Sequence, residues 1–123
     1  MKKEEKIKYF KSCVYKYIEF FGLFDWEVHI FYQDKPQARA SCYCNIPGKI
    51  ASICYSEWVI SKESTKKEIN KVAFHEVCEL FLSEISNYLE DRSLYTDEKV
   101  VNKLIHTIIR FLENKLWNNL KIK

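Results

Sequence analysis

The chain has 123 residues, with 20 basic and 17 acidic side chains and a formal net charge of +3. This length is enough for one hydrophobic core, so a single domain over residues 1–123 is expected. The mixed charge is not that of a nucleic-acid-binding surface, and no apolar stretch has the length of a membrane span. The first residues are charged and lack the apolar block of a signal peptide, so we expect a cytoplasmic protein with reduced cysteines.

The N-terminal third of the chain predicts a helix followed by a strand. Apolar residues recur at spacings of three and four over 4–21, which predicts an amphipathic helix, and Gly22 is a suitable residue to end it. Side chains over 26–32 then alternate between two faces, which indicates a half-buried strand.

Two further strands are predicted at 38–45 and 50–55. Pro47 and Gly48 form a turn between them, so these strands are expected to pair as a hairpin. Cys42 and Cys44 would point to the same face of the first of these strands. No partner pair with zinc-site spacing follows them, so we interpret them as small core residues.

Two helices are predicted in the second half of the chain. Thr65 and Glu68 fit the N-terminal capping pattern of a helix that runs to about Glu84. A polar stretch over 87–93 predicts a loop, and Thr96 is suited to cap a last helix that runs to about 120. The order of elements predicts an α+β domain in which a small three-stranded antiparallel sheet packs on the helices.

The residues with the clearest chemical meaning lie in the run VAFHEVCEL of the first of these two helices. His75 and Glu79 are four residues apart, so they project from one helix face and could hold one metal ion. In the HExxH pattern of metallopeptidases, the glutamate in the position of Glu76 is the general base for the metal-bound water. Glu79 stands where the second histidine is expected. A carboxylate can replace an imidazole in a zinc shell, but it adds negative charge and favours harder ions.

A metal site needs a third donor, and the spacing alone leaves several residues open. Glu98 and His106 are eight residues apart and share one face of the last helix. Asp97 and Asp91 are further candidates. Each has an ordinary structural explanation as well, because acidic residues in a first helical turn favour the helix dipole and a histidine can simply lie at the edge of a core. The motif residues themselves could also form a solvated helix face without metal.

The order of these segments resembles a known family. The runs FGLFDWEVHIFY, ARASCYC, IASICYSEW, KVAFHEVCELFL and DEKVVNKLIHTIIRFLEN, from about Leu23 to Asn114, are similar to small phage-encoded metallopeptidase-like proteins. These are minimal zincin-like domains, distantly similar to SprT-like proteins. The resemblance implies a zincin-like α+β fold and a metal-dependent hydrolase that cleaves protein or peptide substrates. For a phage-encoded protein, it implies the cytoplasm of the host cell.

The resemblance also implies roles for single residues. His75 would be the first metal ligand, Glu76 the base and Glu79 the second ligand. The third ligand would be a glutamate at the start of the following helix, which indicates Glu98, with Asp97 as its neighbouring option. The ion would be zinc or another divalent metal, and the strand at 50–55 would line the cleft and pair with an extended peptide.

The negative charge of this ligand set would need a positive partner. A His, Glu, Glu shell carries two formal negative charges, so Glu79 and Glu98 would repel each other without a cation. Lys71, one turn before His75, is a possible neutralising partner.

The alternative function is a catalytically inactive zincin-like fold that acts as a phage-type protein-binding module on a host protein. Exposed aromatic residues would then be its anchors. The candidates are Trp58, Tyr88, Tyr95 and Trp117. Nucleic acid is not expected as a partner, because the net charge is small.

Overall fold

The structure is a computed structural model that describes residues 1–92 and 98–120, without the side chains of 89–92. Its elements are α1 (Lys3–Phe20), β1 (Glu27–Tyr32), β2 (Ala40–Asn45), β3 (Ile50–Tyr55), α2 (Glu57–Ile60), α3 (Lys66–Phe81), α4 (Ser83–Arg92), α5 (Glu98–Lys115) and a 3-10 turn, η1 (Trp117–Asn119). The predicted α+β class is confirmed. Within the described ranges, no helix combines the length and the apolar character needed to cross a bilayer.

The sheet has the strand order β1-β3-β2. β2 and β3 pair antiparallel around the turn at Ile46–Lys49, so the predicted hairpin is confirmed. β1, in contrast, pairs parallel with β3, and the prediction of a fully antiparallel sheet was wrong. The turn residues specify only the pairing of β2 with β3. The segment 33–39 carries the chain across the end of the sheet, so that β3 inserts between the two earlier strands.

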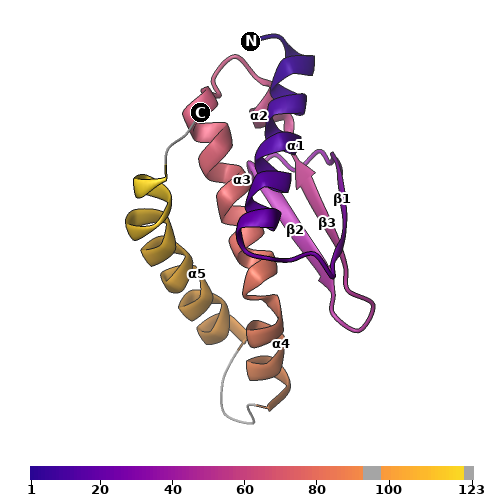
Figure 1. The fold of residues 1–123 in the computed structure, drawn as a ribbon, viewed down its shortest axis with the longest axis vertical. Helices are drawn as coiled ribbons and strands as arrows, with labels where there is room; N and C mark the ends of the chain where they lie inside the picture. The colour runs from indigo at the N-terminus through magenta and orange to yellow at the C-terminus, as the bar shows by residue number, and fades with distance from the viewer. Residues whose placement is uncertain (93–97, 121–123) are drawn as a thin grey trace.

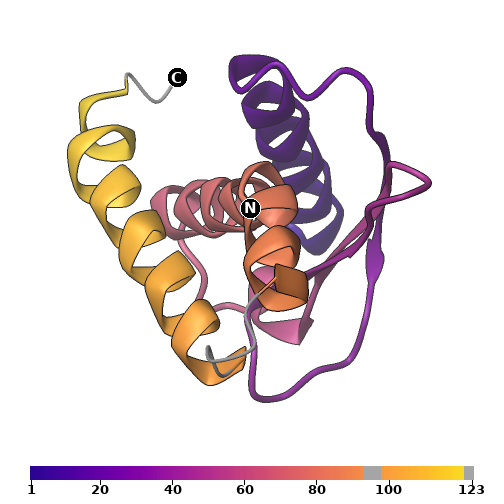
Figure 2. The ribbon, with the colours of Figure 1, turned by 90° about the horizontal axis from the view of Figure 1, so that it is seen from below.

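The helices form two layers on one face of the sheet (Figures 1 and 2). α1 and α3 pack on the core face, where Phe10 of α1 meets Tyr55 of β3 edge-to-face and Tyr17 of α1 meets Phe74 of α3 in the same way. α5 lies on the far side of α3 and runs antiparallel to it. α3 therefore has the sheet and α1 on one side and α5 on the other, and its His75 and Glu79 side chains face α5.

Two predicted helix ends are confirmed by their hydrogen bonds. Gly22 has φ of 69°, and the N–H groups of Gly22 and Leu23 donate to the carbonyls of Glu19 and Ile18, which closes α1 with a left-handed glycine. At the start of α3, Thr65 Oγ1 accepts from the backbone N–H of Glu68 at 3.2 Å. The cap satisfies one of the backbone N–H groups that the first turn of α3 would otherwise leave without an acceptor.

The loop predicted after the motif helix was wrong. α3 ends at Phe81, and α4 follows almost directly over Ser83–Arg92. The break lies at Leu82, and the Ser83 hydroxyl donates to the carbonyl of Leu80 at 2.6 Å. The stretch is polar, but it contains no glycine or proline, so nothing in it prevents a helix. The predicted cap at Thr96 lies outside the described residues.

The four aromatic residues considered as binding anchors have different environments. Trp117 is buried in the core, and Trp58 is half-buried with the Arg39 guanidinium 4.0 Å from its ring centroid. Tyr88 is exposed, and Tyr95 lies outside the described residues. Of the three that the structure describes, only Tyr88 is exposed in the way a binding anchor requires.

A buried asparagine connects three parts of the core. The side-chain oxygen of Asn70, in α3, accepts from the Tyr17 hydroxyl and, at 2.9 Å, from the indole N–H of Trp117. Its amide nitrogen donates to the Tyr9 hydroxyl at 3.1 Å. Asn70 is 2% exposed, and burial raises the pKa of Tyr17 to about 12, so this hydroxyl stays protonated and donates. Asn70 thus ties α1 and the C-terminal turn to α3.

Replacing Asn70 by alanine should lower the free energy of unfolding by about 2–4 kcal/mol, because two buried donors lose their acceptor. Urea unfolding measures this loss. Asn118→Ala is the matched control, since Asn118 is exposed and its amide makes one hydrogen bond of 3.3 Å to its own helical turn. The control should stay within about 0.5 kcal/mol of the parent chain. A loss below about 1 kcal/mol for Asn70→Ala would contradict this role.

Candidate metal centre

α3 presents two of the predicted ligands on one face. His75 and Glu79 are one turn apart, and His75 Nε2 lies 3.8 Å from Glu79 Oε1. Both side chains are half-buried, at 30% and 26% exposure. They are therefore open to an incoming ion and still partly shielded from bulk water.

The third donor comes from α5. His106 Nε2 lies 3.1 Å from Glu79 Oε1, and the rings of His106 and His75 are 5.6 Å apart between centroids. One donor atom from each of His75, Glu79 and His106 lies within 4.8 Å of the other two. Among the described residues, this is the group of histidine, cysteine and acidic side chains whose spacing suits a metal ion.

The structure does not bring Glu98 to this group. Glu98 is exposed at the first residue of α5, about 12 Å along the helix axis from His106. Asp97 and the side chain of Asp91 lie outside the described residues. Of the two candidates whose side chains the structure describes, Glu98 and His106, it is His106 that meets His75 and Glu79.

Lys71 does not form an ion pair with Glu79 within the described structure. Its ammonium lies 5.5 Å from the centroid of the Trp117 ring, one turn from His75. The positive charge of Lys71 lowers the pKa of His75, although the hydrogen bond to Glu113 has the larger, opposite effect and raises it. Lys71 thus belongs to the border of the site.

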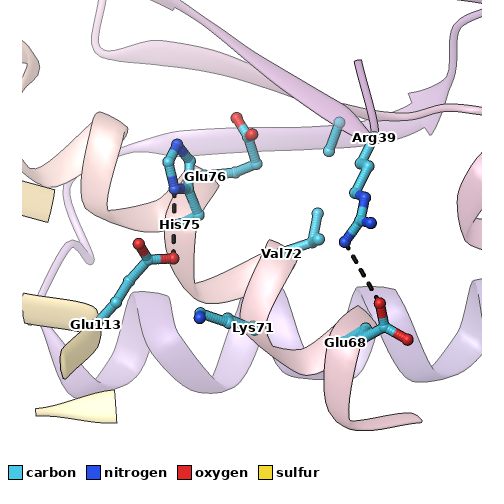
Figure 3. Close-up of a pocket in the computed structure, with 8 residues that line it drawn as sticks. Arg39, Glu68, Lys71, Val72, His75, Glu76 and Glu113 are labelled. Atoms are coloured by element: carbon cyan, nitrogen blue, oxygen red, sulfur yellow. Dashed lines mark hydrogen bonds and ion pairs between the residues drawn. The ribbon is translucent and has the colours of Figure 1, made fainter. Parts of the chain in front are cut away.

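Both histidines are oriented by an acceptor at their Nδ1 atoms. His75 Nδ1 lies 3.4 Å from Glu113 Oε2, as the dashed line in Figure 3 shows, and His106 Nδ1 lies 2.8 Å from the Asn102 carbonyl oxygen. A carbonyl only accepts hydrogen bonds, so His106 Nδ1 carries the proton, and a neutral ring then has its lone pair at Nε2. In both histidines, Nε2 is the nitrogen that faces Glu79.

This donor set fits a divalent metal ion. Two imidazoles and one glutamate form a known donor set of catalytic zinc, which leaves one position open. In a tetrahedral shell with bonds of about 2.0–2.2 Å, donor atoms are about 3.3–3.5 Å apart. The distances of 3.1 and 3.8 Å from Glu79 to the two histidines bracket this value. Two imidazole lone pairs facing a carboxylate repel it unless a proton or a cation lies between them.

Glu76 lies beside this group in a nearly closed environment. Its side chain is 5% exposed and points from α3 toward β2 (Figure 3). Burial raises the pKa of Glu76 well above its ordinary value, and the negative charge of Glu79 raises it further. The Oε2 atom has no hydrogen-bond partner among the described residues. A buried carboxyl oxygen without a partner is costly, so it is suited to a ligand or a water molecule.

Two pockets open beside the donors. One, of about 420 Å³, is bordered by His75, Glu76 and Glu113 at one end, and by Arg39 with its ion-pair partner Glu68, 3.5 Å away, at the other (Figure 3). A second, of about 260 Å³, is lined by residues of β2, α3, α4 and α5. These residues include Cys42, Cys44, Glu79, Ser83 and His106. Glu79 therefore lies within reach of a molecule in the second pocket.

The strand beside the site is β2 and not β3. β3 is hydrogen-bonded on both sides and has no free edge, so the prediction that it pairs with an extended peptide was wrong. β2 is at the edge of the sheet, packs against α3 and contributes residues to both pockets. In the described part of the chain, no strand pairs with its outer side.

Sequence reasoning missed Glu113. Its side chain is only 12% exposed, although it lies on a helix surface that the sequence does not distinguish. The available signal was its position seven residues after His106, which is two helical turns and so the same face of α5. A search for outer partners of a predicted metal histidine would have included it.

No protein-family model, no curated protein and no solved structure matches this chain. The family resemblance inferred from the sequence therefore stays an expectation.

In the metal-free protein, His106 should be in the Nδ1–H form, because the Asn102 carbonyl requires a donor there. Ring ¹⁵N NMR at a pH where imidazoles are neutral distinguishes the two forms. Asn102→Ala keeps the backbone carbonyl and should leave the form of His106 unchanged. An Nε2–H ring at His106 would show that the lone pair does not face Glu79.

Proposed function

We propose that this chain is a divalent-metal-dependent hydrolase of peptide bonds. The observation that carries the proposal is that one donor atom from each of two histidines and one glutamate, on α3 and α5, lies within 4.8 Å of the other two. The set consists of His75, Glu79 and His106, and its formal charge is one negative unit when both rings are neutral. Zinc suits this set, and two histidines with one carboxylate also hold ferrous iron in non-haem enzymes.

Three side chains would hold the ion, and the hydrogen-bond partners of the two histidines would orient their rings. Glu113 and the Asn102 carbonyl fix the two rings through Nδ1, which directs each Nε2 toward the ion. A divalent ion bound there supplies Lewis-acid activation of a water molecule and of the scissile carbonyl. The partly shielded position of the three donors strengthens these electrostatic effects.

Glu76 is the residue suited to proton transfer. It is adjacent to His75, it is buried, and one of its oxygens has no protein partner among the described residues. A base in this position removes a proton from the attacking water and delivers it to the leaving amine. Because the Glu76 carboxyl is buried, it can keep that proton from bulk water between the two steps.

A peptide substrate is supported by the free edge of β2. An extended peptide can add to an exposed edge strand through main-chain hydrogen bonds. β2 borders both pockets, so a peptide along its edge would pass in front of the donors and of Glu76. The larger pocket would then receive a side chain of this peptide.

Zn²⁺ should shift the ring ¹⁵N resonances of His75 and His106 and leave His29 unchanged. His29 is the chain's third histidine and an internal control, since it lies on β1 and pairs with Glu27 at 3.0 Å. His75→Ala and His106→Ala should each weaken zinc binding by about 10- to 100-fold or more. That range is typical of losing only an outer-shell partner, and these two residues are direct donors in the proposed site. Glu98→Ala should have no effect. A loss of affinity on Glu98→Ala with none on His106→Ala would contradict this donor set.

Glu76→Gln should keep metal binding and lower peptide cleavage by about 10²- to 10⁴-fold, because the amide cannot accept the proton. Mass spectrometry of a mixed peptide library incubated with the zinc-loaded chain measures cleavage. Zinc binding without cleavage by the parent chain would exclude the hydrolase and leave the metal site intact. Equal cleavage by Glu76→Gln would exclude Glu76 as the base.

A further inference from the structure

The cysteine pair of β2 is a second group of metal-binding side chains that the proposed hydrolase does not use. Cys42 and Cys44 are two residues apart on one strand, so both point to the core face of the sheet. Their Sγ atoms are 3.7 Å apart, and both residues are half-buried. The chain's other cysteines, Cys13, Cys54 and Cys78, are buried.

The distance between the two sulfur atoms matches the distance between two thiolate sulfurs bound to one metal ion. With bonds of about 2.3 Å and a tetrahedral angle at the ion, two thiolate sulfurs are about 3.8 Å apart. In the metal-free protein the same separation is that of a hydrogen bond between the two thiols, which an ion bound by both sulfurs would replace. Because both lie on one strand, the pair could bind an ion without a change in the backbone.

The surroundings of the pair favour a cation. Both thiols line the pocket that also contains Glu79 and His106. The Glu76 carboxyl, with its partnerless buried oxygen, points toward β2 from the neighbouring helix (Figure 3). The thiols themselves are reached from the pocket, so an ion entering it meets sulfur donors on one wall and nitrogen and oxygen donors on the other.

We propose that Cys42 and Cys44 form a second metal position for a thiophilic d¹⁰ ion of the zinc and cadmium class. Binding releases the two thiol protons to solvent and forms two metal–sulfur bonds. Among the described residues, no third histidine, cysteine or acidic donor lies within 4.8 Å of both sulfurs, so solvent completes the shell. The ion is therefore exchangeable, unlike the ion of a closed four-ligand structural site. This site does not depend on the proposed hydrolase.

¹¹³Cd NMR of the reduced full-length chain tests the proposal, because thiolate ligands shift the cadmium resonance far downfield of nitrogen and oxygen ligands. The parent chain should give a downfield thiolate resonance, and Cys42→Ser with Cys44→Ser should abolish it. Cys54→Ala is the matched control, since Cys54 lies on the opposite face of the neighbouring strand and should leave this resonance in place.

The outcomes for the two metal positions are separable. His106→Ala should remove only a resonance of nitrogen and oxygen ligands, and the thiolate resonance should remain even if the hydrolase site binds nothing. Circular dichroism of the double serine variant checks that it is folded. The absence of a thiolate resonance in the parent chain, or its persistence in the folded double variant, would overturn the proposal.

Discussion

The antiparallel packing of α5 on α3 is the constraint on which the candidate site depends. Val101, Ile105 and Ile109 of α5 are buried in the core that includes the apolar face of α3, and this stripe sets the register of the two helices. Polar side chains pair along the same interface at intervals of about one or two turns. The pairs are Glu79 with His106, His75 with Glu113, and Asn70 with Trp117. A shift of one turn would separate all three pairs together, so the apolar packing and the Asn70 hydrogen bonds fix the geometry of the donors.

Much of the fold follows from local sequence. The apolar period of three and four identifies α1 and α3, Gly22 and Thr65 mark helix ends, and the turn at Pro47 and Gly48 pairs β2 with β3. The placement of β1 beside β3 could not be predicted, because it depends on which edge of the hairpin buries more apolar surface. The identity of the third metal donor could not be predicted from the sequence either. Glu98 and His106 share a helix face, and only the register of α5 on α3 decides which of them reaches Glu79.

The donor set can be compared with the metallopeptidase pattern by residue type. In the HExxH pattern both residues on the motif helix are histidines and the third donor can be a glutamate. In this chain the motif helix has Glu79 in the second position, and the partner helix supplies His106. The group therefore consists of two imidazoles and one carboxylate, the same donor types as in a His, His, Glu zinc site. The set also has one negative charge fewer than the His75, Glu79, Glu98 set, so less repulsion must be overcome before an ion binds.

The most direct measurement is a crystal structure of the zinc-loaded chain with anomalous scattering at the zinc edge, which locates the ion without assumption about its ligands. We expect an ion between α3 and α5, about 2.0–2.2 Å from His75 Nε2, His106 Nε2 and an oxygen of Glu79. An ion that has Glu98 in its shell, or that leaves His106 uncoordinated, would contradict this expectation.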